Sequence, residues 1–123
     1  MFFKKTMQKF KVFQIQLTDA EHDHVNANGH DSLPKHRIRI DMDMDFAGTQ
    51  VAKLAREAMS NGYYTHVSNI TAEDVTQVFE VGNIGPESQI ERLGRMSSVS
   101  VGNVVEEPNG TQWVCAAFGW KEL

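Results

Sequence analysis

The sequence predicts an α+β fold, with a largely antiparallel sheet of about six strands and two or three helices packed on it. Two kinds of pattern support this fold class. Segments that alternate apolar and polar residues are typical of half-buried strands, and apolar residues three or four positions apart are typical of helices. Along the chain these patterns alternate as strand, helix, strand, helix, strand and helix, and three closely spaced strands come last.

The ends of the expected elements follow from capping and turn residues. Thr18 and Glu21 have the spacing of a capping box, and Asn61-Gly62 provides a typical helix end. The sequence Glu107-Pro108-Asn109-Gly110 predicts the turn of an antiparallel hairpin. The expected strands are Phe10–Leu17, Arg37–Phe46, Tyr63–Ile70, Gln89–Met96, Val99–Val105 and Gln112–Trp120, and the expected helices are Asp19–Ala27, Thr49–Ser60 and one from Asp74 toward Gly82.

Length and composition predict one folded domain. The chain has 123 residues, of which 41% are hydrophobic and 23% are charged, as in ordinary globular domains. We expect a single α+β domain over residues 9–123, preceded by a short basic tail at residues 1–8. No segment approaches the roughly 20 apolar residues that a membrane helix requires, or resembles a signal peptide, so we expect a cytoplasmic protein that does not bind membranes.

The charge distribution bears on the class of partner. The net charge is −4, and because the first eleven residues contribute +4, the remainder carries −8. Nucleic-acid binding relies mainly on neutralising phosphates with Lys and Arg. An acidic body therefore argues against it, and contact through the basic tail is the remaining form of a nucleic-acid-associated module.

Three aspartates, Asp41, Asp43 and Asp45, would share the charged face of the second expected strand at intervals of about 7 Å. Arg37 and Arg39 continue the same face. Such a face can be a solvated surface that discourages pairing between sheet edges, a site for a hard cation such as Mg²⁺, or a surface that binds a protein. We take these five residues as the candidate partner-binding site.

The histidines suggest a second kind of site. Four of the five, His22, His24, His30 and His36, fall within fifteen positions beside several carboxylates, and imidazole and carboxylate are ordinary zinc and iron ligands. However, residues two apart diverge on a helix, and no established spacing such as His-Glu-x-x-His is present. These histidines are the candidate metal ligands, and a polar surface segment is the alternative.

Motifs for covalent catalysis and phosphate binding are absent from the sequence. There is no Gly-x-Ser-x-Gly elbow, and the single cysteine, Cys115, lies in an apolar run that favours a buried thiol over a catalytic one. The glycines around Asn83 follow a helix, whereas a nucleotide site requires a strand-to-helix loop. We therefore assign no catalytic residue and expect no cofactor.

Three segments in the second half of the chain, roughly Tyr64 to Leu123, carry a family resemblance. They are a helix with Glu73-Asp74-Val75 and Val78-Phe79, the run Ser98-Val99-Ser100-Val101-Gly102-Asn103-Val104-Val105, and Trp113-Val114-Cys115 leading into Phe118-Gly119-Trp120. On these residues the chain resembles the YodL-like domains of phages, plasmids and integrative elements, in which an aspartate usually occupies the position of Asn103. The resemblance implies an accessory protein of a virus or mobile element, and it implies no catalytic residue.

These observations favour a binding protein. We expect a phage or mobile-element accessory protein that binds and inhibits a host protein in the cytoplasm, through its acidic surface. A metal-dependent enzyme that uses the three aspartates and the histidine cluster is one alternative. A nucleic-acid-associated module is the other.

Overall fold

A computed structural model describes residues 6–123, which contain four α-helices and a six-stranded antiparallel sheet, as the predicted α+β class requires. Residues 1–5 of the predicted basic tail lie outside the described residues, and Gln8 already belongs to the first strand. The strands are β1 (Gln8–Ile15), β2 (Tyr64–Ala72), β3 (Ile90–Arg92), β4 (Val104–Glu106), β5 (Gln112–Cys115) and β6 (Trp120–Glu122); the helices are α1 (Asp19–Asn28), α2 (Pro34–Asp43), α3 (Val51–Ser60) and α4 (Val75–Asn83), with 3-10 turns η1 (His30–Ser32) and η2 (Glu87–Gln89).

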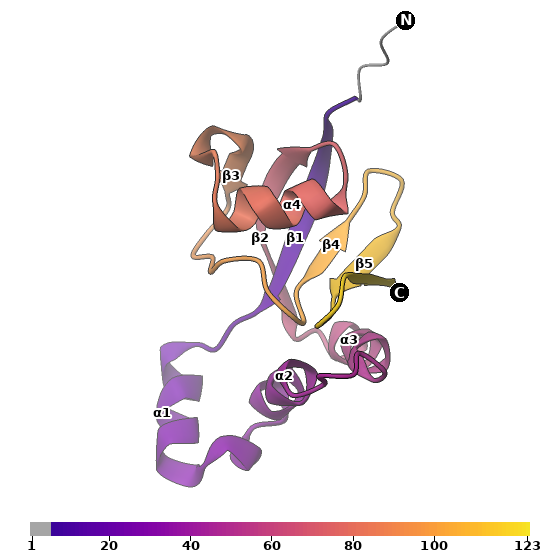
Figure 1. The fold of residues 1–123 in the computed structure, drawn as a ribbon. Coiled ribbons are helices and arrows are strands. Elements are labelled where there is room, and N and C mark those ends of the chain that lie inside the picture. The colour runs from indigo at the N-terminus through magenta and orange to yellow at the C-terminus, as the bar shows by residue number, and fades with distance from the viewer. Residues whose placement is uncertain (1–5) are drawn as a thin grey trace, which may run out of the picture.

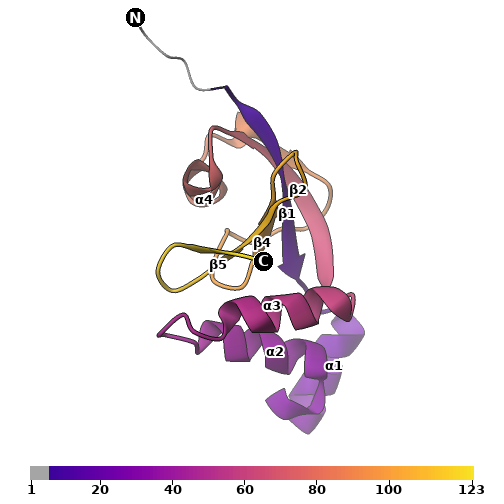
Figure 2. The ribbon, with the colours of Figure 1, turned by 90° about the vertical axis from the view of Figure 1, so that its right-hand side faces the viewer.

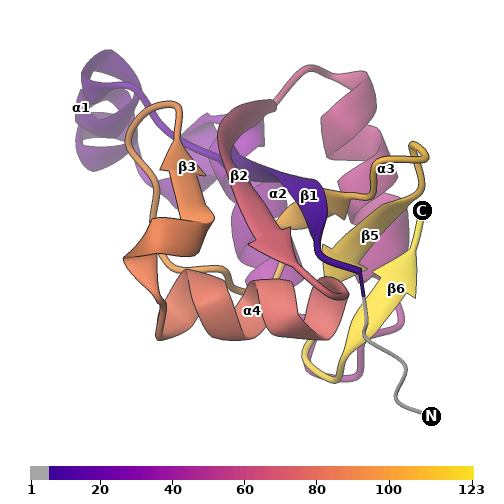
Figure 3. The same cartoon turned by 90° about the horizontal axis from the view of Figure 1, so that it is seen from above.

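The sheet has the order β3-β2-β1-β4-β5-β6, and every neighbouring pair is antiparallel. Strand β1 lies near the centre and pairs with β2 along its whole length and with β4 over three residues. The register between β1 and β2 shifts at Val67, the extra residue of a β-bulge. Figure 3 shows the short strands β3 and β6 at opposite ends of the sheet.

Two hydrophobic cores lie on the two faces of the sheet. Figures 1 and 2 show α4 against one face, and α1, α2 and α3 gathered at one end of the sheet. Strand β4 contributes to both cores, because Val105 packs with the α4 core and Val104 with the core of α2 and α3. Burial of each valine stabilises the fold by about 1.5–3 kcal/mol. The paired valines therefore join the two cores across one strand.

Local signals predicted several of these elements correctly. The capping box of α1 is present, since Thr18 Oγ1 accepts from Glu21 N–H at 3.1 Å and the Glu21 carboxylate accepts from Thr18 N–H at 2.9 Å. Asp74 caps α4 by accepting from Gln77 N–H at 2.9 Å. The turn that begins at Glu107 connects β4 and β5 as the predicted hairpin.

The strand predicted over Arg37–Phe46 is wrong, because these residues form most of helix α2 and the loop after it. Pro34 occupies the first turn of α2, a position that its fixed φ angle favours. Ile38 and Met42, four residues apart, are buried on one helix face, whereas Met44 and Phe46 are 61% and 68% exposed. The alternation was therefore real in the sequence, but the helical i, i+4 pair determines which side chains are buried.

Two predicted strands are shorter than expected because turns interrupt them. In the segment before β4, Asn103 Oδ1 accepts from Ser100 N–H at 3.0 Å and closes a turn, so only residues from Val104 onward are extended. In the last segment, Ala116 N–H donates to Gly119 O at 2.9 Å, and this turn separates β5 from β6. Because β6 is a separate strand, the sheet still has the six strands that were predicted, although residues 37–46 form no strand. The segment predicted over Gln89–Met96 forms a strand only at β3.

Gly82 provides a test of how tightly α4 packs. A Cβ atom there would collide with Val99 Cγ2. Replacing glycine with alanine inside a helix ordinarily stabilises by about 1 kcal/mol, whereas overpacking a core costs about 1–3 kcal/mol. We expect Gly82→Ala to lower the free energy of unfolding by about 1 kcal/mol, measured by urea denaturation.

A double-mutant cycle supplies the control for this prediction. In a Val99→Ala background Cγ2 is absent and the Cβ of residue 99, at 3.1 Å, is the closest remaining contact, so Gly82→Ala should be clearly less destabilising there. Equal losses in both backgrounds would show that Val99 is not the cause.

Candidate functional site

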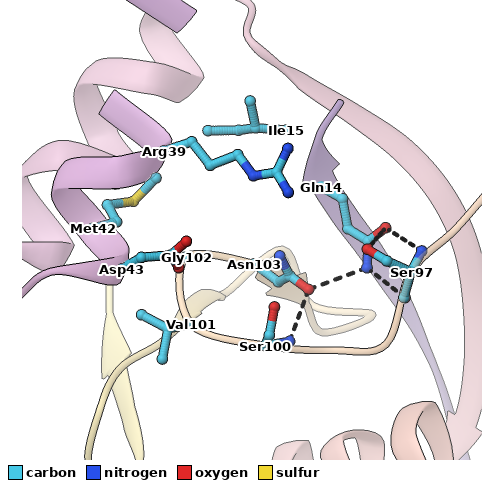
Figure 4. Close-up of a pocket in the computed structure, with 10 residues that line it drawn as sticks. All are labelled: Gln14, Ile15, Arg39, Met42, Asp43, Ser97, Ser100, Val101, Gly102 and Asn103. Atoms are coloured by element: carbon cyan, nitrogen blue, oxygen red, sulfur yellow. Dashed lines mark hydrogen bonds between the residues drawn. The ribbon is translucent and has the colours of Figure 1, made fainter. Parts of the chain in front are cut away.

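A polar cleft lies between α2 and the loop of residues 97–103, with a volume of about 40 Å³. Figure 4 shows the Arg39 side chain extending from α2 across the cleft toward Gln14 of β1. The cleft thus brings together three segments that are far apart in the sequence. Its lining residues are Gln14, Ile15, Arg39, Met42, Asp43, Ser97, Ser100, Val101, Gly102 and Asn103.

The buried side chain of Gln14 fixes the loop. Gln14 is 1% exposed, and its Nε2 donates to Ser97 O at 2.8 Å and to Asn103 Oδ1 at 3.1 Å. Its Oε1 accepts from Ser97 N–H at 3.1 Å. A buried amide requires such partners, because leaving it unpaired costs about 1–3 kcal/mol. The loop therefore lies where Gln14 can be satisfied.

Tyr64 fixes the opposite end of the loop against α2. Its hydroxyl donates to Gly102 O at 2.6 Å and lies 3.7 Å from Met42 Sδ. Burial raises the pKa of Tyr64 well above its ordinary value, so the phenol remains a donor. Gly102 N–H donates to Cys115 O at 2.8 Å. Strands β2 and β5 and helix α2 consequently meet at Gly102.

The two charged residues of the cleft act on one another. Desolvation raises the pKa of the Asp43 carboxyl group above its ordinary value, and the positive charge of Arg39 opposes this rise. Within residues 6–123, Arg39 has no carboxylate at ion-pair distance. The guanidinium group of Arg39 is therefore available to a bound anion.

A second hollow of about 320 Å³ continues from the cleft and shares Ile15, Arg39 and Ser97 with it. The half-buried Met96 provides most of its apolar surface, and Ile15 and Leu17 also line it, although they are only 6% and 3% exposed. Across the described residues Arg95 also lacks an ion pair. We call this hollow the arginine groove, lined by Ile15, Gln16, Leu17, His22, Arg39, Arg95, Met96 and Ser97.

The structure does not place the five predicted partner-binding residues on one face. Asp45 caps α3, because its carboxylate accepts from the N–H groups of residues 49, 50 and 51 at 3.3, 2.9 and 2.8 Å. The bond from residue 50 is the largest cause of the lowered pKa of Asp45. Asp41 lies 3.9 Å from Arg37 as a helical ion pair, and only Asp43 and Arg39 line the cleft.

The four predicted metal ligands are also divided. His24 Nδ1 lies 3.4 Å from Asn28 Nδ2, and His22 lines the arginine groove. His30 Nδ1 and His36 Nε2 are 3.0 Å apart, and desolvation, followed by the charge of His30, lowers the pKa of His36. Within the part of the chain that the structure describes, no three His, Cys, Asp or Glu side chains gather to hold a metal ion.

Comparisons with known proteins add no assignment. No protein family, curated protein or solved structure matches this chain. The YodL-like resemblance stays a prediction, but its residues have a clear structural role, since Asn103 closes the turn beside the cleft and Val104 and Val105 lie in different cores. Over residues 6–123, no helix has the length and apolar character needed to span a bilayer.

Sequence reasoning missed Gln14 and Arg95. Gln14 follows Phe10 and Val12 on the same buried face of β1, so a glutamine in an apolar series was the available signal. Arg95 has no comparable signal, because it approaches Arg39 only through the fold.

Substitution of Gln14 tests its control of the loop. Gln14→Leu keeps the bulk but removes all the hydrogen bonds of the side-chain amide, and we expect a loss of about 2–3 kcal/mol in the free energy of unfolding. Gln14→Glu keeps the shape but faces Ser97 O and Asn103 Oδ1 with an acceptor, so its loss should be larger. Urea denaturation measures both, and a Gln14→Glu variant as stable as the original would contradict this role.

The reactivity of Cys115 tests whether the thiol has a chemical role. Burial raises the pKa of the Cys115 thiol to about 11. At about pH 8 roughly one thiol in a thousand is then ionised, so labelling by a disulfide reagent should be about 100-fold slower than in the unfolded chain. Rapid labelling of the folded protein would instead favour a reactive thiol.

Proposed function

We propose that the protein binds a partner protein through the arginine groove, which accepts an extended segment carrying carboxylates beside apolar side chains. The observation that carries this proposal is the combination of an apolar lining, mainly at Met96 and in part at Ile15 and Leu17, with two arginines that lack ion pairs within residues 6–123. A ligand with both kinds of group would satisfy both parts of the groove.

The chemistry of the groove favours carboxylates. A guanidinium group presents a planar set of donors that matches a carboxylate, and each charge-assisted hydrogen bond contributes about 1.5–3 kcal/mol. Burial of one leucine side chain adds about 1.5–3 kcal/mol. The volume of about 320 Å³ accommodates a few side chains of such a segment.

The overall charge favours a protein over a nucleic acid. Beyond residue 11 the chain carries a net charge of −8, which repels a phosphate backbone over any long contact. A short acidic segment avoids most of this repulsion, since it requires only the local charges of Arg39 and Arg95.

The biological setting is part of the same proposal. The resemblance to YodL-like domains supports an accessory protein of a phage or mobile element, and binding to a host protein in the cytoplasm would inhibit that protein. Of the five residues predicted from the sequence, Arg39 is central to this version and Asp43 lies beside it. The version of the proposal in which an acidic surface binds the partner loses support, because the three aspartates do not share one face of a strand.

Fluorescence anisotropy with a labelled, C-terminally amidated dodecapeptide of alternating leucine and glutamate tests the proposal. We expect Arg39→Ser and Arg95→Ser each to weaken binding at least about tenfold, because each removes a charge-assisted contact. Arg37→Ser is the matched control, since Arg37 lies on the same helix but outside the groove.

Other outcomes would reject the groove as an acidic-segment site. Equal affinity for a peptide with lysine in place of glutamate would reject it. Unchanged affinity of Arg39→Ser and Arg95→Ser for the glutamate peptide would also reject it. Tighter binding of a single-stranded DNA would favour the nucleic-acid alternative. Loss of lysine-peptide binding in an Asp41→Ser/Asp43→Ser double variant would favour the acidic-surface version; Asp45 is retained there because it caps α3.

A further inference from the structure

The polar cleft has the donors and the size for a single carboxylate. Asn103 Oδ1 already accepts from Gln14 and from Ser100 N–H, so its amide nitrogen is turned away from them. Figure 4 shows this nitrogen and the Ser100 hydroxyl directed into the cleft, below the side chain of Arg39. Two neutral donors and one cation therefore surround the same space.

The volume limits what can enter. About 40 Å³ is room for roughly three water-sized groups, which matches one carboxylate and not a further side chain. The loop, held by Gln14 and by the Tyr64 bond to Gly102, lines the cleft with residues 100–103, which do not line the arginine groove. A chain that follows the groove into the cleft thus has no space to continue.

We infer that the cleft binds the free C-terminal carboxylate of the partner segment, while the arginine groove binds the residues that precede it. This inference rests on the proposed function and names the group that enters the cleft. Arg39 serves both parts, because it lines the cleft and the groove. Capture of a chain end by converging donors is an established mode of peptide recognition.

Asp43 gives the cleft a preference for where the carboxylate lies. Its carboxyl group lines the same space and repels a second carboxylate, so the bound group is held toward Arg39, Ser100 and Asn103. Asp43→Asn removes this repulsion, and we expect it to bind a free-acid peptide more tightly than the original protein does.

Comparison of a free-acid peptide with the amidated leucine–glutamate dodecapeptide, otherwise identical, tests the inference. We expect the free acid to bind at least about tenfold more tightly, because amidation removes the charge that Arg39 and the neutral donors recognise. Asn103→Asp retains the Oδ1 acceptor of the turn but replaces the amide donor with a carboxylate oxygen. This variant should fold normally by circular dichroism and bind both peptides with similar affinity.

Asn109→Asp is the matched control, because it makes the same change of charge in the hairpin turn, outside the cleft. It should retain the preference for the free acid. Equal affinity of the original protein for the two peptides would overturn the inference while leaving the proposed function intact, provided that binding still depends on Arg39 and Arg95. A free-acid preference that survives Asn103→Asp would also overturn it.

Discussion

The requirement that the buried Gln14 amide be satisfied organises the candidate site. Strand β1 lies inside the sheet with apolar neighbours on both faces, so a polar side chain there needs protein partners. The loop of residues 97–103 supplies them through the backbone of Ser97 and the side chain of Asn103. The stability of the fold and the geometry of the candidate site are coupled as a result, because the group that satisfies Gln14 also orients the amide nitrogen of Asn103.

The two cores determine which charges remain available. Helix α2 buries Ile38 and Met42, and this orientation places Arg39 over the cleft and leaves Arg37 beside Asp41 at the surface. Two arginines on one short helix thus have different surroundings, since Arg37 lies in a helical ion pair and Arg39 lines the cleft. The acidic composition of the chain does not predict this local positive surface. The surface exists because α2 and the loop before β4 lie side by side.

Features that depend on local hydrogen bonds could be predicted from the sequence, as the capping box at Thr18 and the hairpin turn at Glu107 show. The error at Arg37–Phe46 has a simple origin: Ile38 and Met42 satisfy a two-residue and a four-residue period equally well, and the first period predicted a strand. Arg39 and Asp43 were among the residues chosen from the sequence, but their convergence with Gln14 and Arg95 could not be predicted, because these residues belong to separate segments whose contact depends on tertiary packing.

The central position of β1 also shapes how the chain reaches its native state. Residues 8–15 pair with residues 64–72 and 104–106, so the sheet is built from contacts between distant parts of the chain. Such topologies fold slowly, on a scale of about milliseconds to seconds, because long loops must close before the pairing stabilises them. During synthesis, strand β1 therefore has no neighbouring strand until residue 72 has been made. The side of the cleft opposite α2 forms only after the loop of residues 97–103 has also been made.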